Sequence, residues 1–199
     1  MITFRKAAAP DAETLAELGR STFVEAFGHL YRPEDLETFL GEAHSVAAFR
    51  RILDDDHNIV LIAQSPNRAL GYGIGGRCKL PVAQLEARAG EVKRLYVRAE
   101  AQGQQVGTQL LDRLIEQLER REHDPLYVGV WSENFGAQRL YVRYGFVKFG
   151  EYDFPIGKKL DREYILRRPP RRAGAHESTA QSPVAREPAA REPAVQKRQ

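Results

Sequence analysis

The chain has 199 residues, of which 42% are hydrophobic and 29% charged, so it can build a buried core and is not typical of a wholly disordered protein. The sequence has no run of about 18 apolar residues, the length that a helix needs to span a bilayer, and we expect no secretory signal in its first residues. The single cysteine, Cys78, excludes an internal disulfide and fits a reducing cytoplasm. One cysteine and five scattered histidines argue against a structural zinc site, and we expect no bound metal.

The net charge of +3 is unevenly distributed. Residues 167–199 hold eight basic and three acidic side chains, a net charge of +5, so the remaining 22 basic and 24 acidic side chains give 1–166 a net charge of −2. The basic excess therefore says nothing about what the folded body binds, and we expect no nucleic-acid partner for it. An adaptor that binds nucleic acid through the basic C-terminal segment stays open as an alternative.

The C-terminal segment differs in composition from the rest. From Arg167 onward there is no Leu, Ile, Phe, Tyr or Trp, and Pro, Ala, Arg and Glu dominate. Such a stretch cannot bury enough apolar surface to offset its ordering entropy. We therefore expect one folded domain over 1–168 and a disordered tail over 169–199.

The first half of the domain alternates between strand and helix patterns. We expect a strand at 2–5, then a helix that begins after Asp11 and carries an apolar stripe from Leu15 to Phe27. Two shorter helices follow, one at 34–40 beginning at Pro33 and one at 46–53 capped by Ser45. Strands at 58–64 and 69–78, separated by a four-residue turn, predict a hairpin.

The second half contains a β-α-β unit. It consists of a strand at 90–97, an amphipathic helix at 106–121 and a strand at 126–130. A connection of that length implies a parallel pair with a right-handed crossover. A helix at 135–144 and strands at 146–154 and 161–166 complete a mixed α/β fold, in which helices flank a central, mostly antiparallel sheet with one parallel pair.

The loop before the amphipathic helix has the composition of an anion site. It reads Gln102-Gly103-Gln104-Gln105-Val106-Gly107-Thr108, and no acidic residue occurs until Asp112. Helix starts usually favour acidic side chains, so their absence leaves the N-terminal N–H groups free for an external phosphate. A polar loop that merely lacks acids is the alternative. The glycine spacing matches neither a P-loop nor a dinucleotide-binding fingerprint.

A second motif follows the next strand, with Asn134, Ala137, Leu140, Tyr141, Gly145 and Phe146 at fixed spacings. Helix capping by Asn134, an apolar helix face and a helix-ending Gly145 account for most of it. They do not account for a tyrosine at 141, whose hydroxyl costs free energy if it is buried without a partner.

The two motifs together resemble the GCN5-related N-acetyltransferase (GNAT) family. The strand ending Leu95-Tyr96-Val97, the glycine-containing loop and the second motif are similar to that family's core, and the resemblance covers about 2–167. Gln105 stands where the family usually has the middle glycine of the loop, and its side chain restricts the backbone there. Residues 22–36 and 91–97 are similar to the bacterial spermidine/spermine N-acetyltransferase branch, although an ordinary amphipathic helix and strand explain them too.

The resemblance implies direct transfer of an acetyl group from acetyl-CoA to a primary amine, a polyamine or another small amine, in a ternary complex. It assigns the acid that protonates the departing thiolate to Tyr141, and a main-chain donor for the thioester carbonyl to the strand end around Tyr96 or Val97. Coenzyme contacts are expected at Leu95, Tyr96, Val97, Gln102, Gly103, Gln104, Gln105, Val106, Gly107, Thr108 and Asn134.

The acceptor amine must attack in its neutral form, which for a pKa of ~10.4 is about one part in 10³ at pH 7. Glu91 is the candidate base, acting through water, and a paired structural carboxylate is the equal alternative. We expect the acceptor pocket to include His29, Tyr31, Glu25 and Glu34, although a solvated helix surface explains these charges as well. We expect a cytoplasmic enzyme that could form a homodimer and has no membrane partner.

Two alternatives to a small-amine acetyltransferase stay open. The first is an enzyme that acetylates a protein N-terminus or a lysine, which would need an open peptide groove. The second is a non-catalytic module that binds coenzyme A, a hypothesis supported by Gln105 and opposed by the presence of Tyr141 and Asn134.

Overall fold

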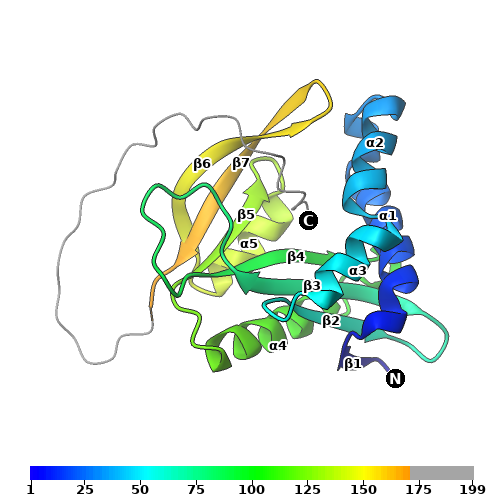
Figure 1. The fold of residues 1–199 in the computed structure, drawn as a ribbon, viewed down its shortest axis with the longest axis horizontal. Coiled ribbons are helices and arrows are strands. Elements are labelled where there is room, and N and C mark those ends of the chain that lie inside the picture. The colour runs from blue at the N-terminus through cyan, green and yellow to red at the C-terminus, as the bar shows by residue number, and fades with distance from the viewer. Residues whose placement is uncertain (171–199) are drawn as a thin grey trace.

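The computed structural model describes residues 1–170 (Figure 1). The predicted tail at 169–199 therefore lies, apart from its first two residues, outside the described part of the chain. Seven strands form one sheet in the order β1-β2-β3-β4-β5-β7-β6. They are β1 (Thr3–Lys6), β2 (Ile59–Gln64), β3 (Ala69–Arg77), β4 (Gly90–Val97), β5 (Leu126–Trp131), β6 (Val147–Ile156) and β7 (Lys159–Arg168).

Helices cover both faces of this sheet, as the sequence predicts. Figure 1 shows α4 on one side of strands β2 to β4, with the first three helices grouped on the other side. The helices are α1 (Ala12–Phe27), α2 (Pro33–Ala43), α3 (Val46–Asp54), α4 (Val106–Arg120) and α5 (Phe135–Arg143), with short 3-10 helices at Ala9–Asp11, Gly28–Leu30 and Ala99–Ala101.

The central strands are apolar on both faces because each face has its own hydrophobic core. On β2, Val60 and Ile62 pack into the core beneath α1, α2 and α3. Ile59, Leu61 and Ala63 point to the opposite face, where they pack with α4. Strand side chains alternate between faces, so a strand buried on both sides reads as the continuous apolar run seen at 59–63.

The predicted β-α-β unit is confirmed, and its two strands separate part-way along their length. Strand β4 pairs with β5 in parallel only from Gly90 to Val92, although β4 itself continues to Val97. On its other edge, β4 pairs with β3 along its whole length, as far as Val97. The two parallel strands therefore share hydrogen bonds at one end and diverge at the end where the α4 loop begins.

The caps predicted for α1 and α3 differ in outcome. Ser45 caps α3 as expected, since its Oγ accepts a hydrogen bond from the N–H of Ala48 at 3.2 Å. Asp11 precedes α1, but its carboxylate does not cap that helix. It instead accepts the N–H of Ala8 at 2.8 Å and pairs with Arg5 at 2.6 Å, because the chain forms a short 3-10 helix just before α1.

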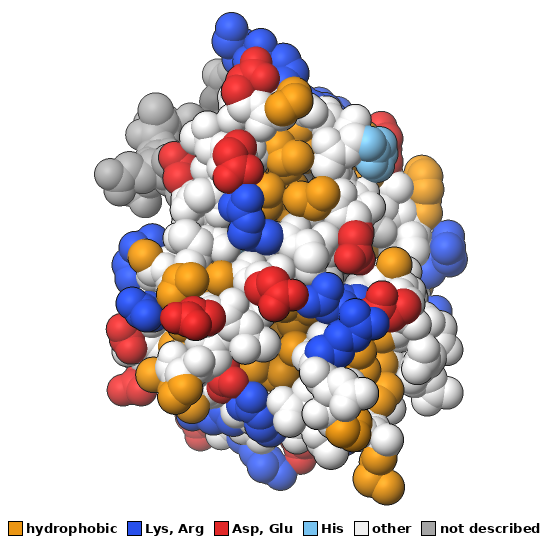
Figure 2. All heavy atoms as spheres, turned by 90° about the vertical axis from the view of Figure 1, so that its right-hand side faces the viewer, with side chains coloured by type: hydrophobic (Ala, Val, Ile, Leu, Met, Phe, Trp, Pro, Cys, Tyr) orange, Lys and Arg blue, Asp and Glu red, His pale blue; other side chains and the backbone are white. Residues whose placement is uncertain are grey.

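Charge on the helical face is mixed. Figure 2 shows this face, the right-hand side of Figure 1, with acidic and basic side chains interspersed among apolar ones. Neither sign of charge dominates it. Within residues 1–170, no helix combines the length and apolar composition needed to cross a bilayer.

Candidate active site

A cavity of about 780 Å³ opens where β4 and β5 diverge, a volume typical of small-molecule sites. Its walls are α1, the end of β4, the loop leading into α4, and the segment from the end of β5 into α5. Of the predicted coenzyme residues, those that line it are Leu95, Tyr96, Val97, Gln102, Gly103, Gln105, Val106, Gly107, Thr108 and Asn134. The divergence of two parallel strands thus brings both sequence motifs to one cavity.

The start of α4 has the geometry of an anion site. No acidic residue lies in the first turn, and the first N–H groups of a helix have no partner within the helix. Gly103 has φ 73° and Gln105 has φ 61°, so the backbone is left-handed at two positions of the loop. These residues fit the diphosphate of coenzyme A, which backbone N–H groups at a helix start can bind.

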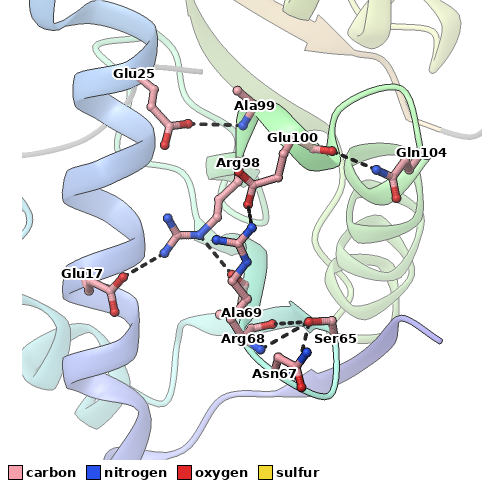
Figure 3. Close-up of polar contacts among 10 residues, drawn as sticks. All are labelled: Glu17, Glu25, Ser65, Asn67, Arg68, Ala69, Arg98, Ala99, Glu100 and Gln104. Atoms are coloured by element: carbon pink, nitrogen blue, oxygen red, sulfur yellow. Dashed lines mark hydrogen bonds and ion pairs between the residues drawn. The ribbon is translucent and has the colours of Figure 1, made fainter.

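A polar network fixes this loop against α1 and β3 (Figure 3). Arg98 donates to the carbonyl of Ala69 at 3.1 Å and pairs with Glu17 of α1 at 2.9 Å. Glu25, about two helical turns further along α1, accepts a hydrogen bond from the N–H of Ala99 at 3.2 Å. Glu17 and Glu25 both belong to α1, so these two contacts hold that helix and the loop, two walls of the cavity, at a fixed distance from each other.

The two tyrosines of the α5 motif differ in environment: Tyr141 is buried in the core, and Tyr144 donates a hydrogen bond to a carboxylate. Asn134 caps the helix as predicted, its Oδ1 accepting the N–H of Ala137 at 3.0 Å. Tyr141 is fully buried and packs edge-on against Phe146, with ring centroids 5.7 Å apart. Tyr144 donates to Asp112 at 2.6 Å, and burial, together with this carboxylate, raises the pKa of Tyr144 to about 12.

Glu91 lies away from the cavity lining. It is fully buried on β4, and its Oε2 accepts the N–H of Lys79 at 2.7 Å. At the rise of a strand, about 13 Å of chain separates it from Leu95, the first residue of β4 that lines the cavity. A role as base therefore requires a relay through water, as predicted from the sequence.

Among the four predicted acceptor residues, the cavity lining includes Glu25 alone. Tyr31 donates its hydroxyl to Asp161 at 2.8 Å and ties the start of α2 to β7. His29 is exposed, and Glu34 is exposed and pairs with Arg32 at 3.0 Å. The structure thus brings one member of this set to the site and uses Tyr31 in packing.

Gln104, predicted to contact the coenzyme, is not among the residues that line the cavity. Its side chain instead forms a hydrogen bond within the loop that precedes α4. Its Nε2 donates to the carbonyl of Glu100 at 2.8 Å, and Glu100 in turn pairs with Arg68. The Gln104 side chain therefore stabilises its own loop.

Other lining residues were not anticipated from the sequence. Arg143 lines the cavity at the end of α5, and the spacing of Ala137, Leu140 and Arg143 could have indicated it, because they share one helix face. Glu133 lies at the other end, just before α5. Trp131 packs edge-on against Phe27 of α1, with ring centroids 5.8 Å apart, and both line the cavity.

Comparison with known proteins decides the family. Residues 22–146 match the model of the acetyltransferase (GNAT) family. The chain belongs to the GNAT family. It is an acyl-CoA-dependent N-acetyltransferase that uses acetyl-CoA, as the sequence resemblance implied.

Relatives and solved structures agree with this family. The chain is 23% identical over 163 residues to a protein of Lactobacillus delbrueckii subsp. lactis named as an uncharacterized N-acetyltransferase, covering 79% of this chain and 91% of the relative. The fold is similar to the PaiA N-acetyltransferase of Thermoplasma acidophilum in complex with coenzyme A, with TM-score 0.68, 20% identity, and 85% and 99% of the two chains covered. It is also similar to a ribosomal-protein-alanine N-acetyltransferase from Brucella melitensis, with TM-score 0.60, 20% identity, and 83% and 98% covered.

Proposed function

We propose that this GNAT enzyme transfers the acetyl group directly from acetyl-CoA to a small primary amine that is cationic in solution, such as a polyamine. The observation that carries the proposal is the distribution of charge along the cavity. Among its lining residues, the guanidinium is Arg143 and the carboxylates are Glu25 and Glu133. An anionic coenzyme and a cationic acceptor can therefore bind at different places in one cavity.

The basic end suits the coenzyme. Arg143 ends α5, and the neighbouring Tyr144 lies within 3.4 Å of the carbonyl of Thr108 in the first turn of α4. The guanidinium and the helix start thus lie on the same side of the cavity. Acetyl-CoA, when bound, supplies a thioester whose carbonyl is open to attack, and the chain supplies the main-chain donors around Tyr96 and Val97.

The acidic end suits the amine. Glu133 precedes α5, and the nine residues of that helix separate it by roughly 13 Å from Arg143. Trp131 and Phe27 provide an apolar wall beside it, which can pack against the carbon chain of an alkylamine. A carboxylate in the cavity lining attracts the ammonium form, which is the dominant form at neutral pH.

Turnover then needs one proton removed from the ammonium group and one delivered to the thiolate. Tyr141 is our proposed acid, as the family resemblance implies; it is buried on α5, the helix that forms one wall of the cavity. Glu91 is the proposed base through water, whereas Glu25 is a carboxylate in the lining that could take the proton without a relay. The substitutions Glu91→Gln and Glu25→Gln distinguish the two candidate bases. The variant that lacks the true base should lose rate most at low pH, where the amine is most fully protonated.

The test is a thiol-release assay with acetyl-CoA and a panel of acceptors. We expect turnover with spermidine and other alkylamines, and little with peptides that begin with alanine or contain a single lysine. Preference for a peptide would replace the proposal with the protein acetyltransferase that the Brucella neighbour exemplifies. Tight binding of coenzyme A without turnover of any acceptor would replace it with a non-catalytic module.

A further inference from the structure

Two glutamates are fully buried in the described part of the chain, Glu91 on β4 and Glu163 on β7. A carboxylate loses its hydration when it is buried, so glutamate is rarely found in a core without a specific cause. Glu91 is the proposed base, and the position of Glu163 in the sheet indicates a connected role.

Glu163 lies between a cavity residue and a buried phenol. In the sheet it is opposite Trp131 of β5 on one side and opposite Tyr152 of β6 on the other. Residues opposite each other on neighbouring strands point to the same face, with their Cβ atoms about 5 Å apart. Trp131 lines the cavity, and Tyr152 donates its hydroxyl to Glu163 at 2.7 Å. Glu163 is therefore one strand away from the cavity wall.

Glu91 lies on the same face of the sheet as Glu163. It is opposite Tyr127 of β5, and Tyr127 points to the same face as Trp131 because the two are four residues apart on one strand. Tyr152 packs against the small hydrophobic cluster that contains Tyr127. The phenol of Tyr152 thus lies in the region that contains both buried carboxylates.

The electrostatics of Tyr152 reflect this arrangement. Burial raises the pKa of Tyr152 well above 10, and the charges of Glu163, Glu91 and Cys78 raise it further. Its hydroxyl therefore stays protonated at neutral pH, as a group that passes a proton between two carboxylates must.

A further carboxylate, Asp161, lies two residues before Glu163 on the same face of β7. It accepts the hydroxyl of Tyr31 at 2.8 Å and pairs with Lys159 at 3.2 Å. These contacts hold Asp161 at the junction of β7 with the start of α2, and its charge is balanced there by a cation.

We propose that Glu163 and Tyr152 form the path by which a proton of the acceptor ammonium group reaches Glu91. The inference rests on the proposed function, because it needs an amine bound beside Trp131. The N–H bond of the ammonium group breaks, its electron pair stays on nitrogen for attack on the thioester, and the proton passes through water to the Glu163 carboxylate. The Tyr152 hydroxyl takes up that proton as it gives its own to Glu91, so the phenol is neutral before and after the transfer. Glu163 and Tyr152 are positioning residues that act through Glu91.

The pH dependence of thiol release with spermidine tests this path. We expect Glu163→Gln and Tyr152→Phe each to lower kcat/KM about 10²-fold at pH 7, within the usual contribution of a general base. The loss should shrink as the pH rises towards 10, because more of the acceptor is then already neutral. The double variant should lose no more than either single variant, because both substitutions interrupt one path.

A second contact between a tyrosine and a glutamate provides the matched control. Tyr127 donates its hydroxyl to Glu86 at 2.7 Å, and Glu86, in the loop between β3 and β4, pairs with Arg167 at 2.7 Å. Glu86→Gln removes a carboxylate of the same kind and should leave the rate unchanged at every pH. The urea midpoint of unfolding, measured for every variant, separates effects on stability from effects on rate.

Ethylamine and trifluoroethylamine give a second readout, because they are similar in shape but the fluorinated amine is already largely neutral at pH 7. Both variants should lose rate with ethylamine and approach the wild type with trifluoroethylamine, whereas a structural defect would lower both rates equally. A wild-type pH profile in either variant, or a loss that is the same at every pH and for both amines, overturns the inference alone. Absence of turnover of every alkylamine by the wild type overturns the proposed function as well.

Discussion

Removing one hydroxyl from α5 should stop catalysis while leaving the fold and the coenzyme site intact. In Tyr141→Phe the ring keeps its edge-on contact with Phe146, so the packing of the fully buried side chain is preserved. If Tyr141 delivers the proton to the thiolate, its loss should lower kcat by about 10²- to 10⁴-fold, the usual contribution of a general acid. The dissociation constant of coenzyme A should stay within about twofold, because phenylalanine keeps the buried ring and its packing on the wall that α5 forms.

The chain offers a matched control three residues later. Tyr144→Phe also removes one hydroxyl, from the residue that follows α5, but this hydroxyl donates to Asp112 of α4 at 2.6 Å. A hydrogen bond to a carboxylate contributes about 1.5–3 kcal/mol when buried, and the partial exposure of this pair reduces the expected loss of stability to about 1 kcal/mol. We therefore expect Tyr144→Phe to be less stable and fully active, and Tyr141→Phe to be stable and nearly inactive.

Two measurements check this pair of outcomes: thiol release from acetyl-CoA between pH 6 and 9, and unfolding in urea. A Tyr141→Phe rate close to that of the wild type at every pH would show that the hydroxyl delivers no proton. A tenfold weaker affinity for coenzyme A, with an equal fall in kcat/KM and no change in kcat, would instead make the hydroxyl a binding group.

Three further predictions follow from charge and burial. Arg143→Ala should weaken coenzyme A binding about tenfold by calorimetry, whereas Arg139→Ala, on the same helix but outside the lining, should not; equal losses would remove Arg143 from the site. Glu133→Gln should raise KM for a diamine severalfold with little change for a monoamine, and a uniform change would contradict acceptor recognition. Burial, helped by nearby Arg94, lowers the pKa of His44 well below 6.5, so the unfolded chain binds a proton that the folded chain does not. Stability should therefore fall as pH drops below about 6.5, by up to ~1.4 kcal/mol per pH unit, and His44→Gln should flatten this slope in urea unfolding; an unchanged slope would mean that His44 is protonated in the folded protein.

The sequence predicted the regular elements well wherever their pattern was strong. The bounds of β4 and of α4 agree with the expected ranges to within one residue, because a continuous strand and a long amphipathic helix carry clear periodicities. The order of the last strands was not predictable in the same way. Strand β7 inserts between β5 and β6, pairing with β5 from Leu126 to Trp131, and this depends on contacts between distant residues rather than on local pattern.

The candidate site shows the same division between local and long-range information. The loop and the α5 motif were found from spacing, because each works within one stretch of chain. The acceptor residues stay a prediction, and Tyr31 shows the limit of local pattern: its hydroxyl donates to Asp161, 130 residues away, a contact that no nearby sequence could indicate. Arg143 and Glu133 reach the cavity because α5 and the segment before it form one of its walls.

An irregularity in β4 explains how a buried glutamate could still serve the acceptor side. Strict alternation would place Glu91 and Tyr96 on opposite faces of the sheet. The pairing of β3 with β4 shifts by one residue between Ile74 and Gly75, and as a result Val92 and Leu95 both pack against α4. Glu91 and Tyr96 then share the opposite face, the one covered by α1. If waters connect them there, Glu91→Gln should depress the rate most at low pH, whereas a loss that is uniform with pH would assign Glu91 to the architecture of the strand.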